Sequence, residues 1–249
     1  MSNVINTLAM PMIKQLFCIM PNCSPRKFNE SPTSDQILSE SLQKVYILFL
    51  QNIIINNMSS IFILNESIEY TKQIFTTLLA SCTNVPDPNV TKSTFTMLRK
   101  LIQQWLLNDA TIGSNSNDNS NSNPNIMPIK VKQMFIHLLM EDSSSVLLQS
   151  CIQFGFNPSD AAMTLSMHKE VIKYQLIAVQ ALGIQYINHF VEKYLVASLS
   201  LSNSIALQYK NYLINTSVGT NNTGTASMKQ FRKYFSSLMK ELNMTGHSK

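Results

Sequence analysis

Hydrophobic residues recur at steps of three and four along most of the chain, and this spacing places them on one face of an α-helix. The clearest case is the segment 88–107. Asp87 before it can accept a hydrogen bond from a free helix N–H, and Pro88 suits the first turn. We expect the buried stripe of this helix to consist of Val90, Thr94, Met97, Leu98, Leu101, Ile102 and Trp105. The opposite side carries Lys92, Ser93, Arg99, Lys100 and Gln103.

The same periodicity predicts helices in most of the remaining chain, and no segment shows the alternation of a strand. In the segment 34–56, which Ser34 or Asp35 can cap, we expect the buried stripe to be Ile37, Leu38, Leu42, Val45, Phe49 and Ile53. Gly183 is placed to end the predicted helix 159–182, because glycine is common just after the last turn of a helix. The other predicted helices cover about 2–18, 67–81, 128–141, 144–154, 159–182, 184–195, 203–214 and 226–242.

Long helices joined by short turns indicate antiparallel helix hairpins stacked side by side. The pair 67–81 and 88–107 has the period of roughly 40 residues that is typical of HEAT repeats. No strict period recurs elsewhere, so the pattern leaves open an α-solenoid or an irregular bundle. We favour an all-α fold, an α-solenoid of HEAT-like antiparallel helix pairs, as a single region over 1–249. Polar and proline-rich stretches predict disordered loops near 19–33, 112–126 and 216–225.

Composition changes this picture little. Apolar residues make up 45% of the 249 residues and charged residues 13%, so a sizeable core is expected. The net charge of +5 is compatible with an anionic partner without requiring one. The first residues lack the basic and apolar parts of a signal peptide. The most apolar run, 45–55, is too short to span a bilayer, so we expect a soluble intracellular chain with no membrane insertion.

No catalytic or metal-binding constellation is evident. The cysteines do not form the paired spacing of a zinc site, so buried reduced thiols are expected at Cys18, Cys23, Cys82 and Cys151. The six glycines form no phosphate-binding loop. His168 is expected to be solvated or to cap a helix. The sequence therefore predicts neither an enzyme nor a bound cofactor or metal.

Several short motifs, in the same order and spacing, resemble the C-terminal region of the exportin-T family of tRNA export receptors, in the importin-β/karyopherin superfamily. They are Met58-Ser59, Val85-Pro86-Asp87-Pro88 with Trp105, Asp160-Ala161, Tyr194-Leu195 and Lys229-x-Phe231-Arg232-x-Tyr234. The resemblance covers the chain from about residue 34. It implies transport of tRNA from nucleus to cytoplasm with Ran-GTP, shuttling between the two compartments, and contact with nuclear pore proteins. The N-terminal arch that carries much of the family's Ran contact is not matched.

Two rows of basic residues are the candidate binding residues. In the last helix the expected buried stripe is Met228, Phe231, Phe235, Leu238 and Leu242, and basic residues face away from it. Such a row can be a solvated helix face, or it can contact phosphates without reading bases. With the resemblance, both rows become candidate contacts to the tRNA backbone: Lys92, Arg99, Lys100, Lys229, Arg232 and Lys233. The alternative is a HEAT-type protein-interaction scaffold that makes no RNA contact.

Overall fold

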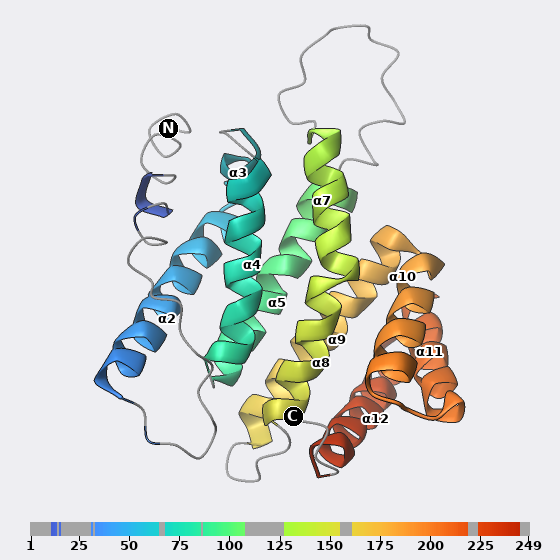
Figure 1. Ribbon diagram of the computed structural model, residues 1–249. Coiled ribbons are helices and arrows are strands. Elements are labelled where there is room, and N and C mark those ends of the chain that lie inside the picture. Colours follow the sequence, from blue (N-terminus) through green and yellow to red (C-terminus); the bar gives the residue numbers. More distant parts are fainter. Residues whose placement is uncertain are drawn as a thin grey trace, which may run out of the picture. The chain divides into compact units, whose positions relative to one another are not determined.

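The computed structural model describes residues 11–13, 15, 31, 33–64, 68–85, 87–107, 127–154, 161–218 and 224–244. All regular structure in these ranges is helical, which confirms the all-α prediction (Figure 1). The chain forms two compact units, Met1–Ile136 and His137–Lys249. The elements are α2 (Ser34–Ile55), α3 (Ile61–Leu64), α4 (Ile68–Asn84), α5 (Pro88–Ile102), η1 (Gln103–Leu107), α7 (Ile129–Met140), α8 (Asp142–Phe154), α9 (Ala161–Leu182), α10 (Ile184–His189), η3 (Phe190–Ser198), α11 (Asn203–Val218) and α12 (Gly224–Met244).

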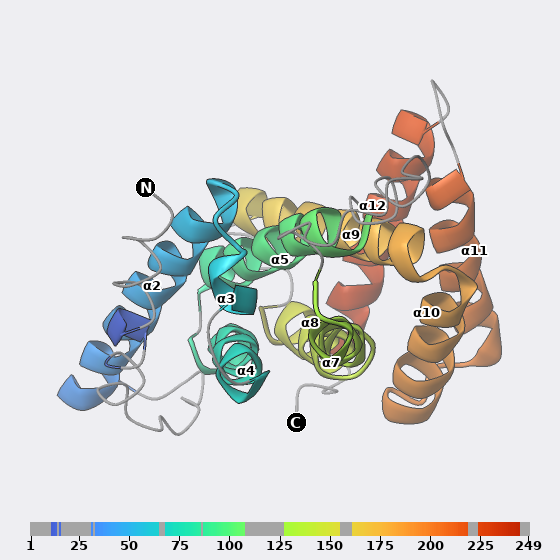
Figure 2. The same cartoon turned by 90° about the horizontal axis from the view of Figure 1, so that it is seen from above.

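In the first unit α4 and α5 form an antiparallel hairpin, and α2 packs against both of them (Figures 1 and 2). Asp87 caps α5 as predicted, since its side chain accepts from the Asn89 backbone N–H at 2.9 Å. Lys44 of α2 reaches the same carboxylate at 2.9 Å. Burial acts to raise the pKa of Asp87, but the contacts from Lys44 and Asn89 outweigh it and hold the pKa below its ordinary value. This aspartate therefore both starts α5 and ties it to α2.

The stripe predicted for the helix 88–107 is confirmed, because all seven of its residues are buried. The stripe predicted for α2 is mostly wrong. Ile37, Leu38 and Val45 are 52, 61 and 57% exposed, Leu42 and Phe49 are half-buried, and of the six only Ile53 is buried. Besides Ile53, α2 buries Ser39, Gln43, Tyr46, Ile47, Leu50 and Ile54. The capping residue also differs, since Thr33 and Gln36 form a reciprocal capping box at the start of α2. Periodicity failed here because α2 carries apolar residues on both faces.

Two segments predicted as ends of ordinary helices are π-helical. They are η1, which follows α5 without a break, and η3, which follows α10. Short π-helical segments are rare and often occur at functional positions. A change to i→i+5 hydrogen bonding rotates the following side chains relative to an α-helix, so both segments alter which residues face their neighbours.

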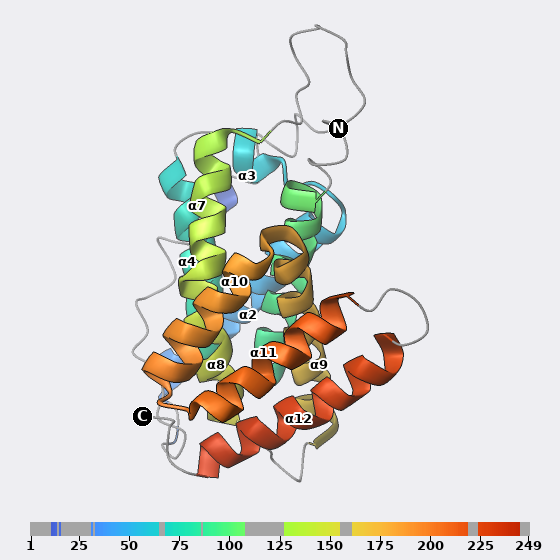
Figure 3. The ribbon, with the colours of Figure 1, turned by 90° about the vertical axis from the view of Figure 1, so that its right-hand side faces the viewer.

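In the second unit α9, α10 with η3, α11 and α12 run back and forth as neighbouring helices (Figure 3). Gly183 ends α9 as predicted and has a φ of +67°, a conformation that favours glycine. The terminal helix α12 packs against α8, α9 and α11. Packing of successive helices against their neighbours is the arrangement of an α-solenoid.

Most other helix predictions agree with the structure to within a few residues, whereas α3 was not predicted. Cys82 and Cys151 are buried thiols that are not part of a disulfide, as expected. The predicted loop near 112–126 and, except for residues 31 and 33, the one near 19–33 lie outside the described residues. Of the loop predicted over 216–225, residues 219–223 lie outside them as well, whereas 216–218 belong to α11 and 224–225 to α12, so the prediction is wrong at both of its ends. Cys18, Cys23 and most of the predicted helix 2–18 also lie outside the described residues.

Candidate nucleic-acid interface

The outer face of α12 carries the most exposed of the predicted basic residues. Lys229 and Lys233 are exposed and lie four residues apart, on the side of α12 opposite its buried stripe. Arg232 lies on the flank of this face and is half-buried. The residues buried beneath them are Phe231, Phe235, Leu238, Met239 and Leu242. Met228 belongs to the predicted stripe but is only half-buried. The terminal helix thus presents positive charge outward from a fixed apolar base.

A pair of stacked tyrosines holds the first half of α12 against α11. The rings of Tyr212 and Tyr234 stack with centroids 4.8 Å apart and planes inclined by 27°, and Tyr212 also stacks on Phe231 at 5.6 Å with nearly parallel planes. The Tyr234 hydroxyl donates to the Ile205 carbonyl at 3.2 Å. These contacts fix the backbone that carries Lys229 and Lys233.

His168 fixes the next turns of α12 from the side of α9. Its Nδ1 lies 3.0 Å from Ser236 Oγ, and its ring packs edge-on against Phe235. The side chain is 1% exposed, so the expectation of a solvated or capping histidine is wrong. Burial lowers its pKa from 6.5 to about 4, and the ring is therefore neutral at physiological pH. It positions α12 and adds no charge to the basic face.

The second predicted row lies on α5, in the other unit. Lys92, Arg99 and Lys100 are half-buried, because α5 packs between α2 and α4 and exposes little of its surface. These three residues share one helix, as predicted. They belong to the first unit, whereas Lys229, Arg232 and Lys233 belong to the second.

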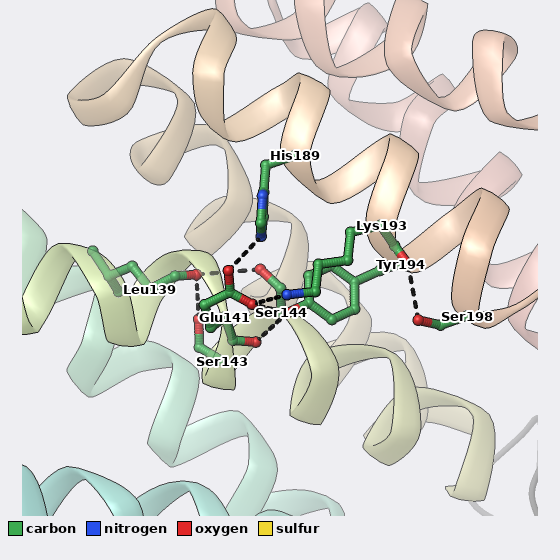
Figure 4. Close-up of polar contacts among 8 residues, drawn as sticks. All are labelled: Leu139, Glu141, Ser143, Ser144, His189, Lys193, Tyr194 and Ser198. Atoms are coloured by element: carbon green, nitrogen blue, oxygen red, sulfur yellow. Dashed lines mark hydrogen bonds and ion pairs between the residues drawn. The ribbon is translucent and has the colours of Figure 1, made fainter.

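Sequence reasoning missed a polar cluster around Glu141, in the turn between α7 and α8 (Figure 4). Lys193 Nζ contacts Glu141 Oε2, and His189 Nε2 lies 3.2 Å from Oε1. The Tyr194 hydroxyl donates to the Glu141 backbone carbonyl at 2.6 Å and lies 3.1 Å from Oε2. The hydrogen bond from Lys193 has the largest effect on the pKa of Glu141 and lowers it. Burial acts in the opposite direction but is weaker, and the hydrogen bond from Tyr194 lowers the pKa further. The cluster pairs Lys193 with a carboxylate, so this exposed lysine is a weak candidate for binding an anion.

A second polar cluster links η1 to the turn before α3. Trp105 Nε1 donates to Ser59 Oγ at 3.1 Å, and Ser59 Oγ donates to Gln104 Oε1 at 2.6 Å. Gln104 Nε2 in turn donates to Asn57 Oδ1 at 2.7 Å and to the Ile54 carbonyl at 3.1 Å. The Trp105 ring packs edge-on against Phe75 and Phe135. Ser59 belongs to the motif Met58-Ser59, and Trp105 to the motif that begins at Val85. The hydrogen bond between the two residues shows that these motifs, far apart in sequence, meet in the fold.

These features define a class of protein: an all-α chain of stacked helix pairs with a basic terminal helix. A model of the Exportin-T family matches residues 1–243, and the chain belongs to this family. It is 26% identical over 112 residues to Exportin-T of Mus musculus and also to Exportin-T of Homo sapiens. In each case the matched residues cover 45% of this chain and 11% of the relative. It is 21% identical over 240 residues to Exportin-T of Yarrowia lipolytica, which covers 96% of this chain and 21% of the relative. The chain thus spans about a fifth or less of the length of these relatives. No solved structure matches it.

Among the described residues, no helix is both long and apolar enough to cross a bilayer.

Proposed function

We propose that this chain forms the C-terminal part of a nuclear export receptor that carries tRNA from the nucleus to the cytoplasm with Ran-GTP. Membership of the Exportin-T family supports this proposal. The observation in this chain that carries it is the outward face of α12, where Lys229 and Lys233 are exposed opposite a buried aromatic stripe. In this proposal Ran-GTP binds mainly through the N-terminal arch of the receptor, outside this chain. The receptor contacts nuclear pore proteins and shuttles between the nucleus and the cytoplasm.

Lysines on one helix face suit a cargo that is recognised by its shape. They neutralise phosphates without a base-specific geometry, and a receptor for many tRNAs needs contacts that are independent of sequence. In this proposal Lys229 and Lys233 make the principal phosphate contacts and Arg232 assists from the flank. Lys92, Arg99 and Lys100 are weaker candidates because they are half-buried.

The test uses a receptor in which this chain replaces its matching segment in Yarrowia lipolytica Exportin-T. Mature tRNA is titrated in the presence of Ran-GTP at two salt concentrations, with the parent fusion and with K229E/K233E. The reversed pair should weaken tRNA binding. It should also lower the slope of log affinity against log salt by about one unit for each lysine that no longer binds a phosphate. Both effects should be independent of the tRNA sequence.

The matched control is K72E/K130E, which reverses two exposed lysines of the other unit and changes the net charge by the same amount. We expect it to keep most of the parent's affinity and slope. Equal losses in the two variants would indicate a general charge effect. If K229E/K233E matches the parent in both affinity and slope, α12 is only a solvated helix face. The chain then fits the alternative of a protein-interaction scaffold without RNA contact.

A further inference from the structure

The helix α2, the first long helix in the described part of the chain, has a second apolar face that is open to solvent. Its members are about half exposed or more: Ile37 (52%), Leu38 (61%), Val45 (57%), Leu48 (57%) and Ile55 (49%). Their spacing places them in one row along the whole of α2. We call this row the outer stripe. It is interrupted only by the exposed residues Ser41, Lys44 and Asn52.

The opposite side of α2 is buried against α4 and α5 through residues such as Tyr46, Leu50 and Ile53. A helix that is apolar all round normally lies inside a protein, covered on both sides. The one cation within the outer stripe, Lys44, is paired with Asp87 at 2.9 Å. The outer stripe is therefore mainly apolar, and the positive charge of Lys44 beside it is paired with the Asp87 carboxylate of the same unit.

The terminal helix α12 shows the opposite character. Where α2 exposes large aliphatic side chains, α12 exposes Lys229, Gln230, Lys233, Ser237 and Lys240. The end of a repeat stack needs a polar outer face to stay soluble, whereas an internal repeat has an apolar face on each side. By this criterion α12 has the surface of an end repeat, and α2 has the surface of an internal one.

We infer that the outer stripe of α2 is the docking surface for a further antiparallel helix pair of the same repeat type, supplied by exportin-T sequence outside this chain. The relatives support this occupant, because the chain spans only 11 to 21% of their length. The stripe from Ile37 to Ile55 extends about 27 Å at the rise of an α-helix, which sets the length of the apolar row it can accept. The two uncharged polar residues of this face, Ser41 and Asn52, already donate to the Ile37 and Leu48 carbonyls of α2 at 2.8 and 3.0 Å, so an apolar neighbour does not leave these donors without a partner.

The experiment compares amide hydrogen exchange of α2 in two contexts: the chain alone, and the chain in place of its matching segment in Yarrowia lipolytica Exportin-T. In the fusion the α2 amides should exchange at least about tenfold more slowly, because a covered helix opens less often. V45Q/L48Q should abolish this difference while leaving exchange in the isolated chain unchanged. The control I184Q/L207Q changes two exposed apolar residues of the other unit, Ile184 and Leu207, and should leave the difference intact.

Equal α2 exchange in the two contexts would overturn the inference, and so would a parent fusion that fails to fold. Two other occupants have distinct signatures, and each also overturns it. A second copy of the chain would show as a concentration-dependent dimer of the isolated chain that V45Q/L48Q dissociates. The chain's own residues 1–18 would show as faster α2 exchange when they are deleted from the isolated chain. These measurements need no RNA, so their outcome is independent of the tRNA titration.

Discussion

Trp105 and Ser59, 46 residues apart, are joined by a 3.1 Å hydrogen bond from the indole Nε1 to the serine Oγ. Both side chains are buried, with 5% exposed for each. The same serine hydroxyl donates to Gln104, so one small residue satisfies two groups of the π-helical segment η1. The contact fixes the turn after α2 against the end of α5 and helps to determine how these helices meet.

Replacing Ser59 with alanine should lower the free energy of unfolding of the first unit by about 1–3 kcal/mol, since it leaves buried polar groups of Trp105 and Gln104 without their partner.

Trp105→Ala should cost about 3–5 kcal/mol because it empties a large aromatic site beside Phe75 and Phe135. Urea unfolding measures both. For Ser59→Ala the fluorescence of Trp105, the single tryptophan of the chain, reports on this unit. Ser60→Ala is the control, since Ser60 is exposed and should change the midpoint little.

His168 should make the second unit less stable in mild acid. Its pKa in the fold is about 4, below the ordinary 6.5, so below pH 6.5 the unfolded chain takes up a proton that the folded chain does not. Stability from the neutral ring is therefore complete above pH 6.5 and is lost as the pH falls toward 4. The full shift is worth about 3 kcal/mol. Thermal unfolding followed by circular dichroism should show a shallower pH dependence for His168→Gln than for the parent, and equal slopes would contradict this role of His168.

In the Glu141 cluster, Tyr194 should matter more for stability than Lys193. Tyr194 is 6% exposed and its hydroxyl donates to a backbone carbonyl, so Tyr194→Phe should cost about 1 kcal/mol. The Lys193 side chain is 50% exposed, and solvent screens its contact with Glu141. Lys193→Gln should therefore cost less than about 1 kcal/mol. Urea unfolding by circular dichroism gives the order of the two variants, and the reverse order would contradict this account.

The two basic rows should respond differently to charge reversal. R99E/K100E changes half-buried side chains of α5 and should lower the stability of the first unit by about 1–3 kcal/mol. K229E/K233E changes exposed side chains and should stay within about 0.5 kcal/mol of the parent. Trp105 fluorescence follows the first unit, and circular dichroism follows the helices of both units, so a transition seen by circular dichroism and not by Trp105 fluorescence belongs to the second. Similar losses for both pairs would mean that the α12 lysines also have a structural role.

Sequence periodicity predicted the helices and their buried faces where polar residues occupy the opposite side, as in α5 and α12. It chose the wrong face of α2, because both of its faces are apolar and only a neighbour decides which is covered. It could not predict η1 or η3, since the hydrophobic spacing of a short π-helical segment barely differs from that of an α-helix. The Glu141 cluster joins residues about 50 positions apart, and no local pattern marks such a contact. The resemblance to the exportin-T family rested on the order of short motifs along the chain. Two of these motifs meet in the fold through the hydrogen bond between Ser59 and Trp105.

The capping box of Thr33 and Gln36 affects how fast α2 can associate with a neighbour. The box satisfies helix N–H groups that have no intrahelical partner, so α2 forms its first turn without outside help. A preformed helix has already given up its backbone entropy, and docking then requires only side-chain adjustment and release of water. Pairing through the outer stripe within one receptor should accordingly proceed as an encounter of two preformed surfaces, in a single step that is independent of protein concentration and has no slow ordering phase.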